Sequence, residues 1–404
     1  YLNQFFELIG WNINTNIAIG SFNFDLAPVI IVAFFTALLV MGTKIGARVD
    51  GALTILKIAI VVFIVVVGFF YIKAENFTPF IPPSEPAAST DGSGVSAVME
   101  QPLWQWATGM APSIYGVTGI ISGAALVFFA FLGFDVVATA SEETINPKKN
   151  VPLGIGVGLG LIIVLYTLVA IVTTGMVSYK DLAKQSDPSL AVAFKMVGAD
   201  WAAKIISLGI VIGMATVVMV LLLGLTRVVF AMSRDGLLPR TLSTTGKHGT
   251  PARLQIVVGV VVAIIAACFN IDVLSDMVNI GTLSAFTLVA LAIPIMRKRR
   301  PDLKRSFRMP GNPWVPLLVA LANFYLMLNL TVLTWIRFLI WLVVGFIIYF
   351  AYGYNHARVG TGELDAEVVK YEKQRQLKAQ RAKQSGSVGR GNDAAVTKVE
   401  AGKD

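Results

Sequence analysis

Nine long apolar segments constrain the fold of this chain more than any other feature of its sequence. A helix needs about 20 apolar residues to cross the hydrocarbon core of a bilayer. Runs of that kind, with few charges, occupy residues 26–42, 51–71, 116–140, 152–176, 205–232, 254–269, 274–296, 316–330 and 335–354. The sequence therefore predicts an all-α membrane protein with nine transmembrane helices.

The composition agrees with a membrane protein and excludes other classes. Hydrophobic residues make up 55% of the 404 residues and charged residues only 14%, with a mean hydropathy of +0.72. A soluble domain carries about 25% charged residues. These values exclude a soluble enzyme and a disordered chain, and they argue against a nucleic-acid binder despite the net charge of +9.

The charges predict the orientation of the chain in the membrane. Every second connection is basic: residues 43–50, 147–151, 233–253 and 297–308. Lys and Arg are enriched in cytoplasmic loops. We therefore expect these connections and the C-terminal tail to face the cytoplasm, with Tyr1 on the outer side of the cytoplasmic membrane.

The longer connections have compositions typical of solvated segments. Residues 81–96 are rich in Pro, Ser, Ala and Gly, which predicts a flexible external loop. Residues 361–384 favour a solvated helix, and the residues from 385 onward are expected to be disordered. The basic run at 297–300 fits a topology anchor and, as an alternative, a contact with anionic membrane lipid.

Lys57 and Asp135 lie inside predicted spans, where ionisable residues are rare and usually functional. Lys57 comes about two turns into its span, so it could snorkel to the interface, exchange a proton or act as a fixed cation. Asp135 follows the segment 128–134, in which Gly133 weakens the helix. This segment is either a simple kink or the discontinuous helix of a transporter site.

Other patterns have simpler explanations. The four glycines at 154, 156, 158 and 160 fit close helix packing better than a dinucleotide loop. His248 and His356 have no metal-ligand spacing, so no metal site is expected. Asn323 and Asn329 can hydrogen-bond between helices. No catalytic cluster is visible in the loops, so we expect neither an enzyme nor a cofactor.

Several motifs together resemble the cationic amino acid transporter family of the amino acid–polyamine–organocation superfamily, in its bacterial type. They are Lys57, FIPP at 80–83, FFAFLGFD at 128–135 followed by EETINP at 142–147, SRDGLLP at 233–239, NIGTL at 279–283 and RPDL at 300–303. Each motif alone is weak, but the combination, which runs from about Phe24 to Tyr354, is specific.

The resemblance implies a LeuT-type fold of two inverted five-helix repeats followed by two more helices. The nine spans would be helices four to twelve, and helices one, two and most of three would be missing from an N-terminally truncated chain. The expected parts are the end of helix three and an external loop (1–25), helices four and five (26–72), an external loop (73–115), the second repeat (116–297), a basic loop with helices eleven and twelve (298–354) and a tail (355–404).

The resemblance also implies roles for individual residues. The carbonyls of Phe129, Ala130 and Leu132 would bind the substrate ammonium, and the Phe129 ring would cover it. Asp135 would be a substrate or proton partner. Met219 would face the side-chain pocket and restrict its size. Lys57 would occupy the cation site of sodium-coupled relatives, which implies coupling to protons.

The resulting hypothesis is a secondary active transporter that moves α-amino acids by alternating access and is coupled to protons, with Lys57 as the residue that exchanges a proton. The alternatives are an amino acid exchanger or a polyamine carrier and, in another class, an amino acid sensor that does not transport. The sequence makes no prediction of the oligomeric state.

Overall fold

The computed structural model describes residues 16–19, 22–41, 43–86, 99–110, 113–139, 144–185, 188–244, 251–268, 271–301, 309–358 and 360–362. The chain forms two compact units. The first contains residues 1–230 and 244–343, and the second contains residues 231–243 and 344–404. The expected helix end before residue 16 and the expected tail structure after residue 362 lie outside the described residues.

Long apolar helices dominate the described residues. Six stretches are long and apolar enough to cross a membrane: Gly51–Phe69, Gly116–Ala138, Pro147–Met176, Asp200–Arg234, Val273–Arg299 and Val332–His356. Three shorter apolar helices are α2 (Leu26–Met41), α12 (Ala252–Cys268) and α14 (Trp314–Leu328). All nine predicted runs therefore contain helix, and the chain is a multi-pass membrane protein.

The bounds of the long helices differ from the predicted runs mainly at their starts. They are α3 (Thr43–Phe69), α6 (Gly116–Val127), α8 (Pro147–Met176), α11 (Asp200–Arg234), α13 (Ile271–Arg299) and α15 (Val332–Ile348), which a π-helix (Tyr349–Gly353) and α16 (Tyr354–His356) continue. Proline favours the first helical turn, because it has no N–H that would need a partner there. Pro147 accordingly starts α8, five residues before the predicted start.

Short elements occupy the connections and the second half of the segment 116–139, and they include strands that an all-α prediction does not contain. The short helices are η1 (Ala74–Phe77), α5 (Leu103–Thr108), α7 (Phe134–Thr139), α9 (Tyr179–Ala183), α10 (Leu190–Met196) and η4 (Arg240–Ser243), with a 3₁₀ turn η2 (Phe128–Phe131). Strand β1 (Asn16–Ile19) pairs with β2 (Phe22–Asp25), and β3 (Glu85–Pro86) pairs with β4 (Ser113–Ile114), both antiparallel.

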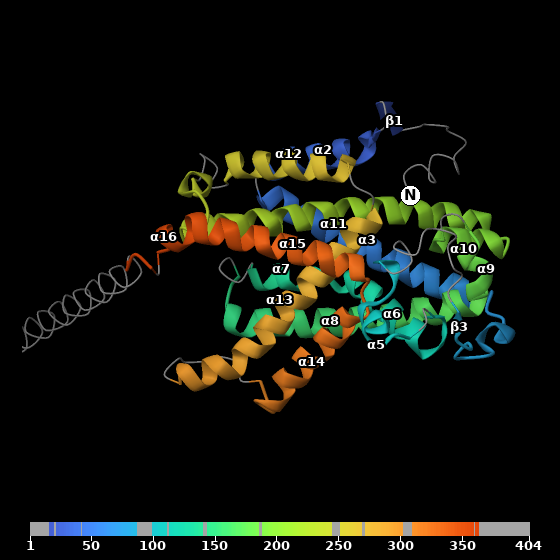
Figure 1. Cartoon of the computed structure of the whole chain (residues 1–404). Coiled ribbons are helices and arrows are strands. Elements are labelled where there is room, and N and C mark those ends of the chain that lie inside the picture. Colours follow the sequence, from blue (N-terminus) through green and yellow to red (C-terminus); the bar gives the residue numbers. More distant parts are fainter. Residues whose placement is uncertain are drawn as a thin grey trace, which may run out of the picture. The chain divides into compact units, whose positions relative to one another are not determined.

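Close packing within the first unit joins helices that are distant in sequence. Helix α12 lies beside α2 (Figure 1), α13 packs against α14, and α3 packs against α8. At Gly68 of α3, an added Cβ would collide with Val172 of α8. A buried cluster around Phe194 and Ile206 continues this contact into α10 and α11. Small residues let membrane helices approach in this way.

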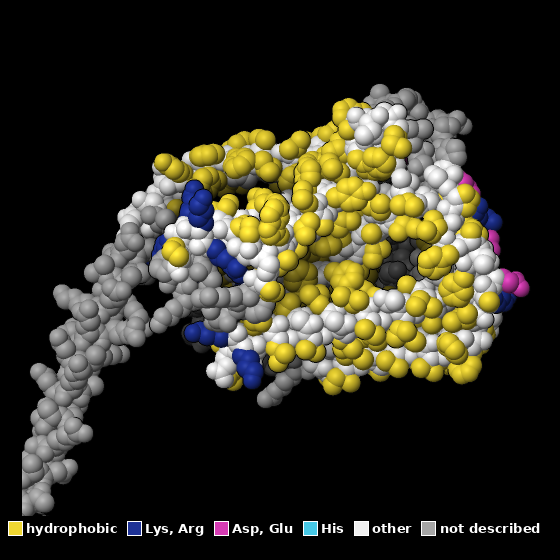
Figure 2. Space-filling view, turned by 90° about the horizontal axis from the view of Figure 1, so that it is seen from below, with side chains coloured by type: hydrophobic (Ala, Val, Ile, Leu, Met, Phe, Trp, Pro, Cys, Tyr) yellow, Lys and Arg dark blue, Asp and Glu magenta, His cyan; other side chains and the backbone are white. Residues whose placement is uncertain are grey.

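The outer faces of the helices are apolar. Figure 2 shows hydrophobic side chains over most of one face of the molecule. Large side chains such as Leu153, Val157 and Ile264 are about half exposed or more. A monomeric soluble protein rarely exposes apolar patches of this extent. In a bilayer these side chains meet lipid, which accounts for their exposure.

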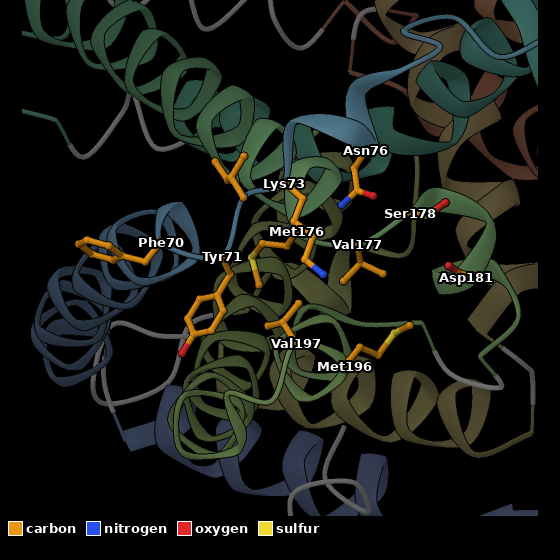
Figure 3. A pocket seen from close by; sticks show the side chains of 11 residues that line it. Phe70, Tyr71, Lys73, Asn76, Met176, Val177, Ser178, Asp181, Met196 and Val197 are labelled. Atoms are coloured by element: carbon orange, nitrogen blue, oxygen red, sulfur yellow. The ribbon is translucent and has the colours of Figure 1, made fainter.

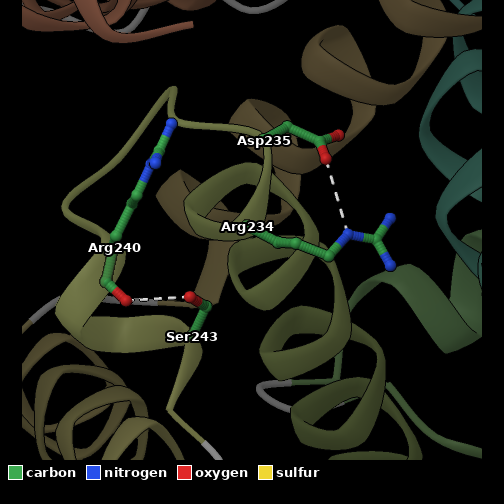
Figure 4. Close-up of polar contacts among 4 residues, drawn as sticks. All are labelled: Arg234, Asp235, Arg240 and Ser243. Carbon is green, nitrogen blue, oxygen red and sulfur yellow. Dashed lines mark hydrogen bonds and ion pairs between the residues drawn. The ribbon is translucent and has the colours of Figure 1, made fainter. Parts of the chain in front are cut away.

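The second unit is built around the motif that follows α11. Arg234 Nε lies 3.4 Å from Asp235 Oδ1, and Ser243 Oγ donates to the Arg240 carbonyl at 2.8 Å (Figure 4). Gly236 has a φ of +82°, and a side chain there would collide with the carbonyl of His356. The glycine of the SRDGLLP motif is therefore required by both backbone and space.

Candidate functional site: a helix broken inside an apolar span

The apolar segment 116–139 is a discontinuous helix. Helix α6 ends at Val127, η2 tightens the chain over Phe128–Phe131, and Leu132 is extended with a ψ of 146°. Gly133 then has a φ of +115°, and α7 starts at Phe134. Only glycine adopts such a φ readily. The structure therefore shows a break in this helix, whereas its use as a transporter site stays a prediction.

Tyr166 of α8 contacts the break directly. Its hydroxyl donates to the Ala130 carbonyl at 3.1 Å, and its ring meets that of Phe131 edge to face at 5.4 Å. The Phe129 carbonyl accepts from Leu132 N–H at 3.2 Å. Two of the carbonyls expected to bind a substrate ammonium therefore hold internal donors in this structure. Tyr166 itself was not predicted, although a polar aromatic side chain in an apolar run was a usable signal.

Helix α13 contacts the break from another direction. Asn279 Nδ2 donates to the Leu126 carbonyl at 3.2 Å. Phe286 lies against Phe128 and Phe134, with ring centroids 6.0 Å and 5.0 Å away. Asn279 was predicted only as part of the NIGTL motif, and Phe286 was not predicted, because a phenylalanine in an apolar helix carries no distinguishing signal.

Lys57 lies near the middle of α3, because this helix begins at Thr43 rather than near residue 51. The candidate membrane span within α3 still begins at Gly51, as predicted. The side chain is half-buried, and its Cγ and Cδ would lie 3.7 Å from a Cβ at Gly213 of α11. Within the part of the chain that the structure describes, no ion pair of Lys57 is found. One turn earlier in α11, Gly209 packs more closely on Ile60, since an added Cβ would lie 2.5 Å from Ile60 Cδ1.

The other two predicted site residues lie on separate helices. Met219 is buried in α11, and Asp135 belongs to α7, with a side chain outside the described part. Five residues after Met219, Gly224 packs on Val136 of α7, where an added Cβ would lie 2.8 Å from Val136 Cγ2. Helix α11 thus touches the segment that follows the break. The structure brings Phe129, Ala130 and Leu132 into one turn, and it places Lys57 and Met219 elsewhere.

A separate cavity of about 500 Å³ lies where α3 and α8 end (Figure 3). Its lining includes Lys73, Asn76, Met176, Val177 and Met196, and none of its lining residues belongs to the broken helix. Asn76 Nδ2 donates to the Gly175 carbonyl at 2.8 Å, which ties the loop after α3 to the end of α8.

An ion pair stabilises the connections beyond α8. Lys180 Nζ lies 2.7 Å from Glu85 Oε1, and the hydrogen bond and the charge of Glu85 raise the pKa of Lys180 above its usual value. Among the described residues, no group of three or more His, Cys, Asp or Glu side chains could hold a metal ion.

Comparison with known proteins identifies relatives of similar sequence over most of the chain. The family model described as amino acid permease matches residues 1–354. The branched-chain amino acid permease BcaP of Bacillus subtilis is 39% identical over 342 residues, which cover 84% of this chain and 66% of the relative. The methylthioribose transporter of the same organism is 38% identical over 335 residues, which cover 83% of this chain and 65% of the relative.

A plant protein is also similar, at greater distance. Cationic amino acid transporter 3, mitochondrial, of Arabidopsis thaliana is 34% identical over 274 residues, which cover 68% of this chain and 40% of the relative. The chain spans just under two thirds of the length of the bacterial relatives. The relatives are permeases and transporters, in agreement with the expectation that the chain is not an enzyme. The chain belongs to the amino acid permease family.

Proposed function

We propose that the chain is part of a secondary transporter that moves α-amino acids across the cytoplasmic membrane by alternating access. The observation that carries this proposal is the helix break at residues 128–133 inside an apolar span. Broken helices provide main-chain groups for charged substrates at the middle of the membrane. The names of the relatives, which include amino acid permeases, support the same function.

The proposed arrangement uses all nine apolar helices as membrane crossings. They take the places of helices four to twelve in a LeuT-type fold, with α6, η2 and α7 together as helix six. The basic connections and the C-terminal end then lie on the cytoplasmic side. The three shorter helices support this assignment because each packs against another apolar helix of the first unit.

The substrate is proposed to bind at the break through its ammonium group. The carbonyls of Phe129, Ala130 and Leu132 accept its hydrogen bonds once the internal donors are displaced, and Asp135 is its charged neighbour. The Phe129 ring, 41% exposed, covers the ammonium. Met219 limits the side-chain pocket, so we propose small neutral amino acids. The branched-chain permeases among the relatives support neutral substrates.

Lys57 is proposed to couple transport to protons. Lys57 belongs to the apolar span Gly51–Phe69, and its side chain packs beside Gly213 of α11, which supports a role for its ammonium group within the span. Such a group is costly in the membrane and is usually functional. Loss and return of its proton during the transport cycle would link amino acid uptake to the pH gradient.

Uptake of radiolabelled L-leucine into proteoliposomes containing the full-length protein tests both parts. We expect uptake to increase when the outside is acidic, and Lys57→Ala to remove this dependence on pH. The exposed Lys195→Ala serves as a matched control and should behave as wild type. If wild-type uptake does not depend on pH, the proposal of proton coupling is contradicted, whereas the proposal of transport is not. The absence of uptake of leucine, alanine and lysine contradicts the transporter proposal.

A further inference from the structure

Helix α13 runs alongside the break and contacts it on both sides. Asn279 and Phe286 are seven residues apart, which is about two helical turns, so they share one face of α13. Asn279 contacts α6 just before the break. Phe286 contacts residues on either side of Gly133. One rigid helix thus bridges the discontinuity.

The Phe286 ring touches both halves of the broken helix. It meets Phe128 of η2 edge to face at 6.0 Å and lies tilted by 31° against Phe134, the first residue of α7, at 5.0 Å. Gly133, between these two rings, leaves the backbone free to pivot because it has no Cβ. A ring held against both sides opposes that pivoting.

Asn279 is a costly residue for its position. It is completely buried, and its neighbours Ile280 and Leu283 are too. Its Nδ2 donates to the Leu126 carbonyl, but its Oδ1 has no partner among the described residues. A buried acceptor without a donor is destabilising, and an apolar side chain of similar shape avoids that cost. The hydrogen bond of Asn279 therefore serves the placement of α6 rather than the stability of the core.

We propose that Asn279 and Phe286 are positioning residues. Together they hold the two halves of the broken helix in register and so set where the carbonyls of Phe129 and Ala130 point. The part of this inference that concerns substrate rests on the proposed transport function. The part that concerns the geometry of the break does not.

The test compares Phe286→Ala and Asn279→Leu in the full-length protein with a control, Asn323→Leu in α14. Asn323 Nδ2 is also buried without a partner among the described residues. Deuterium exchange of the amides at 128–133, without substrate, measures the order of the break. We expect faster exchange in Phe286→Ala and Asn279→Leu, and wild-type exchange in Asn323→Leu and in Phe286→Tyr, which retains the ring.

L-Leucine uptake then separates positioning from simple structural damage. We expect the KM to rise on the order of tenfold in Phe286→Ala and about 2- to 10-fold in Asn279→Leu, with kcat less affected. The melting temperature of Asn279→Leu should equal or exceed that of wild type. Phe286→Tyr should restore the KM.

The outcomes distinguish the two proposals. Wild-type exchange at 128–133 in both Phe286→Ala and Asn279→Leu overturns the positioning role, whatever the transport assay shows. Altered exchange in a protein whose wild type takes up no amino acid leaves the positioning role intact and rejects the transport function. If Phe286→Ala does not fold, the positioning role is decided by comparing deuterium exchange at 128–133 in Asn279→Leu with that in Asn323→Leu.

Discussion

Two apolar segments of the first unit both contain several glycines, but only one of them is interrupted. Helix α8 contains Pro152 and the glycines at 154, 156, 158 and 160, yet it is continuous over 30 residues. The segment 116–139 contains four glycines in 24 residues, the same proportion as the five in the 30 residues of α8, but it breaks at residues 128–133. Glycine content therefore does not decide where a membrane helix is interrupted.

The neighbours of each segment account for the difference. An added Cβ at any of the four α8 glycines would meet nothing within 4 Å, so the expectation that these glycines serve close helix packing is wrong. No described neighbour at these positions competes with the main-chain hydrogen bonds of the helix. Main-chain groups in the membrane need internal partners. At the break, Tyr166 and Asn279 supply donors to the carbonyls of Ala130 and Leu126. The interruption depends on side chains that replace lost helical bonds, and Gly133 then permits the turn.

Gly133→Ala should have the largest effect, because it should remove the break that distinguishes the segment 116–139 from α8. Space is available for the new methyl group, but a φ of +115° is strained for alanine. Such strain costs about 1–3 kcal/mol, and relief of the strain straightens the chain toward a continuous helix. We expect the loss of L-leucine uptake in proteoliposomes. Wild-type uptake by a folded Gly133→Ala protein would show that the positive φ is not needed.

Tyr166→Phe should have an intermediate effect, because Tyr166 links α8 to the break. The variant removes the donor to the Ala130 carbonyl and keeps the ring contact with Phe131. A hydrogen bond of this kind contributes about 0.5–1.5 kcal/mol. If the hydroxyl competes with the substrate ammonium, the KM for L-leucine falls by about 2- to 10-fold. A higher KM would instead place the hydroxyl among the groups that bind substrate.

Gly160→Ala should have a smaller effect, and it should stabilise its helix rather than disturb it. Gly160 is helical with open space around it, so alanine fits without strain. Replacing glycine by alanine in a helix interior stabilises it by about 0.5–1 kcal/mol. We expect a slightly higher melting temperature and unchanged uptake. A loss of uptake would mean that α8 needs its glycines for motion or packing during transport.

The smallest effect, on the melting temperature, is expected for the ion pair between Lys180 of α9 and Glu85 of β3. Because its pKa is raised in the folded protein, Lys180 contributes stability below its ordinary pKa of 10.5, and this is lost as the pH rises through the raised value. The pair is exposed and should be screened by salt. Melting temperatures of wild type and Glu85→Gln should differ slightly at pH 7 and converge as the pH rises through the raised pKa of Lys180. A difference that does not shrink as the pH rises above 10.5 would contradict this origin.

The sequence predicted the helices well and the details of the site only partly. Apolar runs need no knowledge of tertiary contacts, so all nine runs contain helix in the structure, and the weak helix around Gly133 marked the break. The start of α3 was missed because residues 43–50 include charges that are untypical of a membrane span, although the candidate span within α3 begins at Gly51, as predicted. Tyr166 and Phe286 contact residues that are 36 and more than 150 positions away in the sequence, respectively. No local pattern indicates which aromatic ring contacts the break.

The three short apolar helices have a consequence for the surrounding lipid. With 16, 17 and 15 residues, α2, α12 and α14 are about 23–26 Å long, whereas the hydrocarbon core is about 30 Å thick. If α2 and α12 cross the membrane as proposed, their shortfall falls on one patch of lipid, because they pack against each other. Bilayers adapt to such mismatch by local thinning. Under the proposed transport function, shorter acyl chains are therefore expected to increase the rate of uptake.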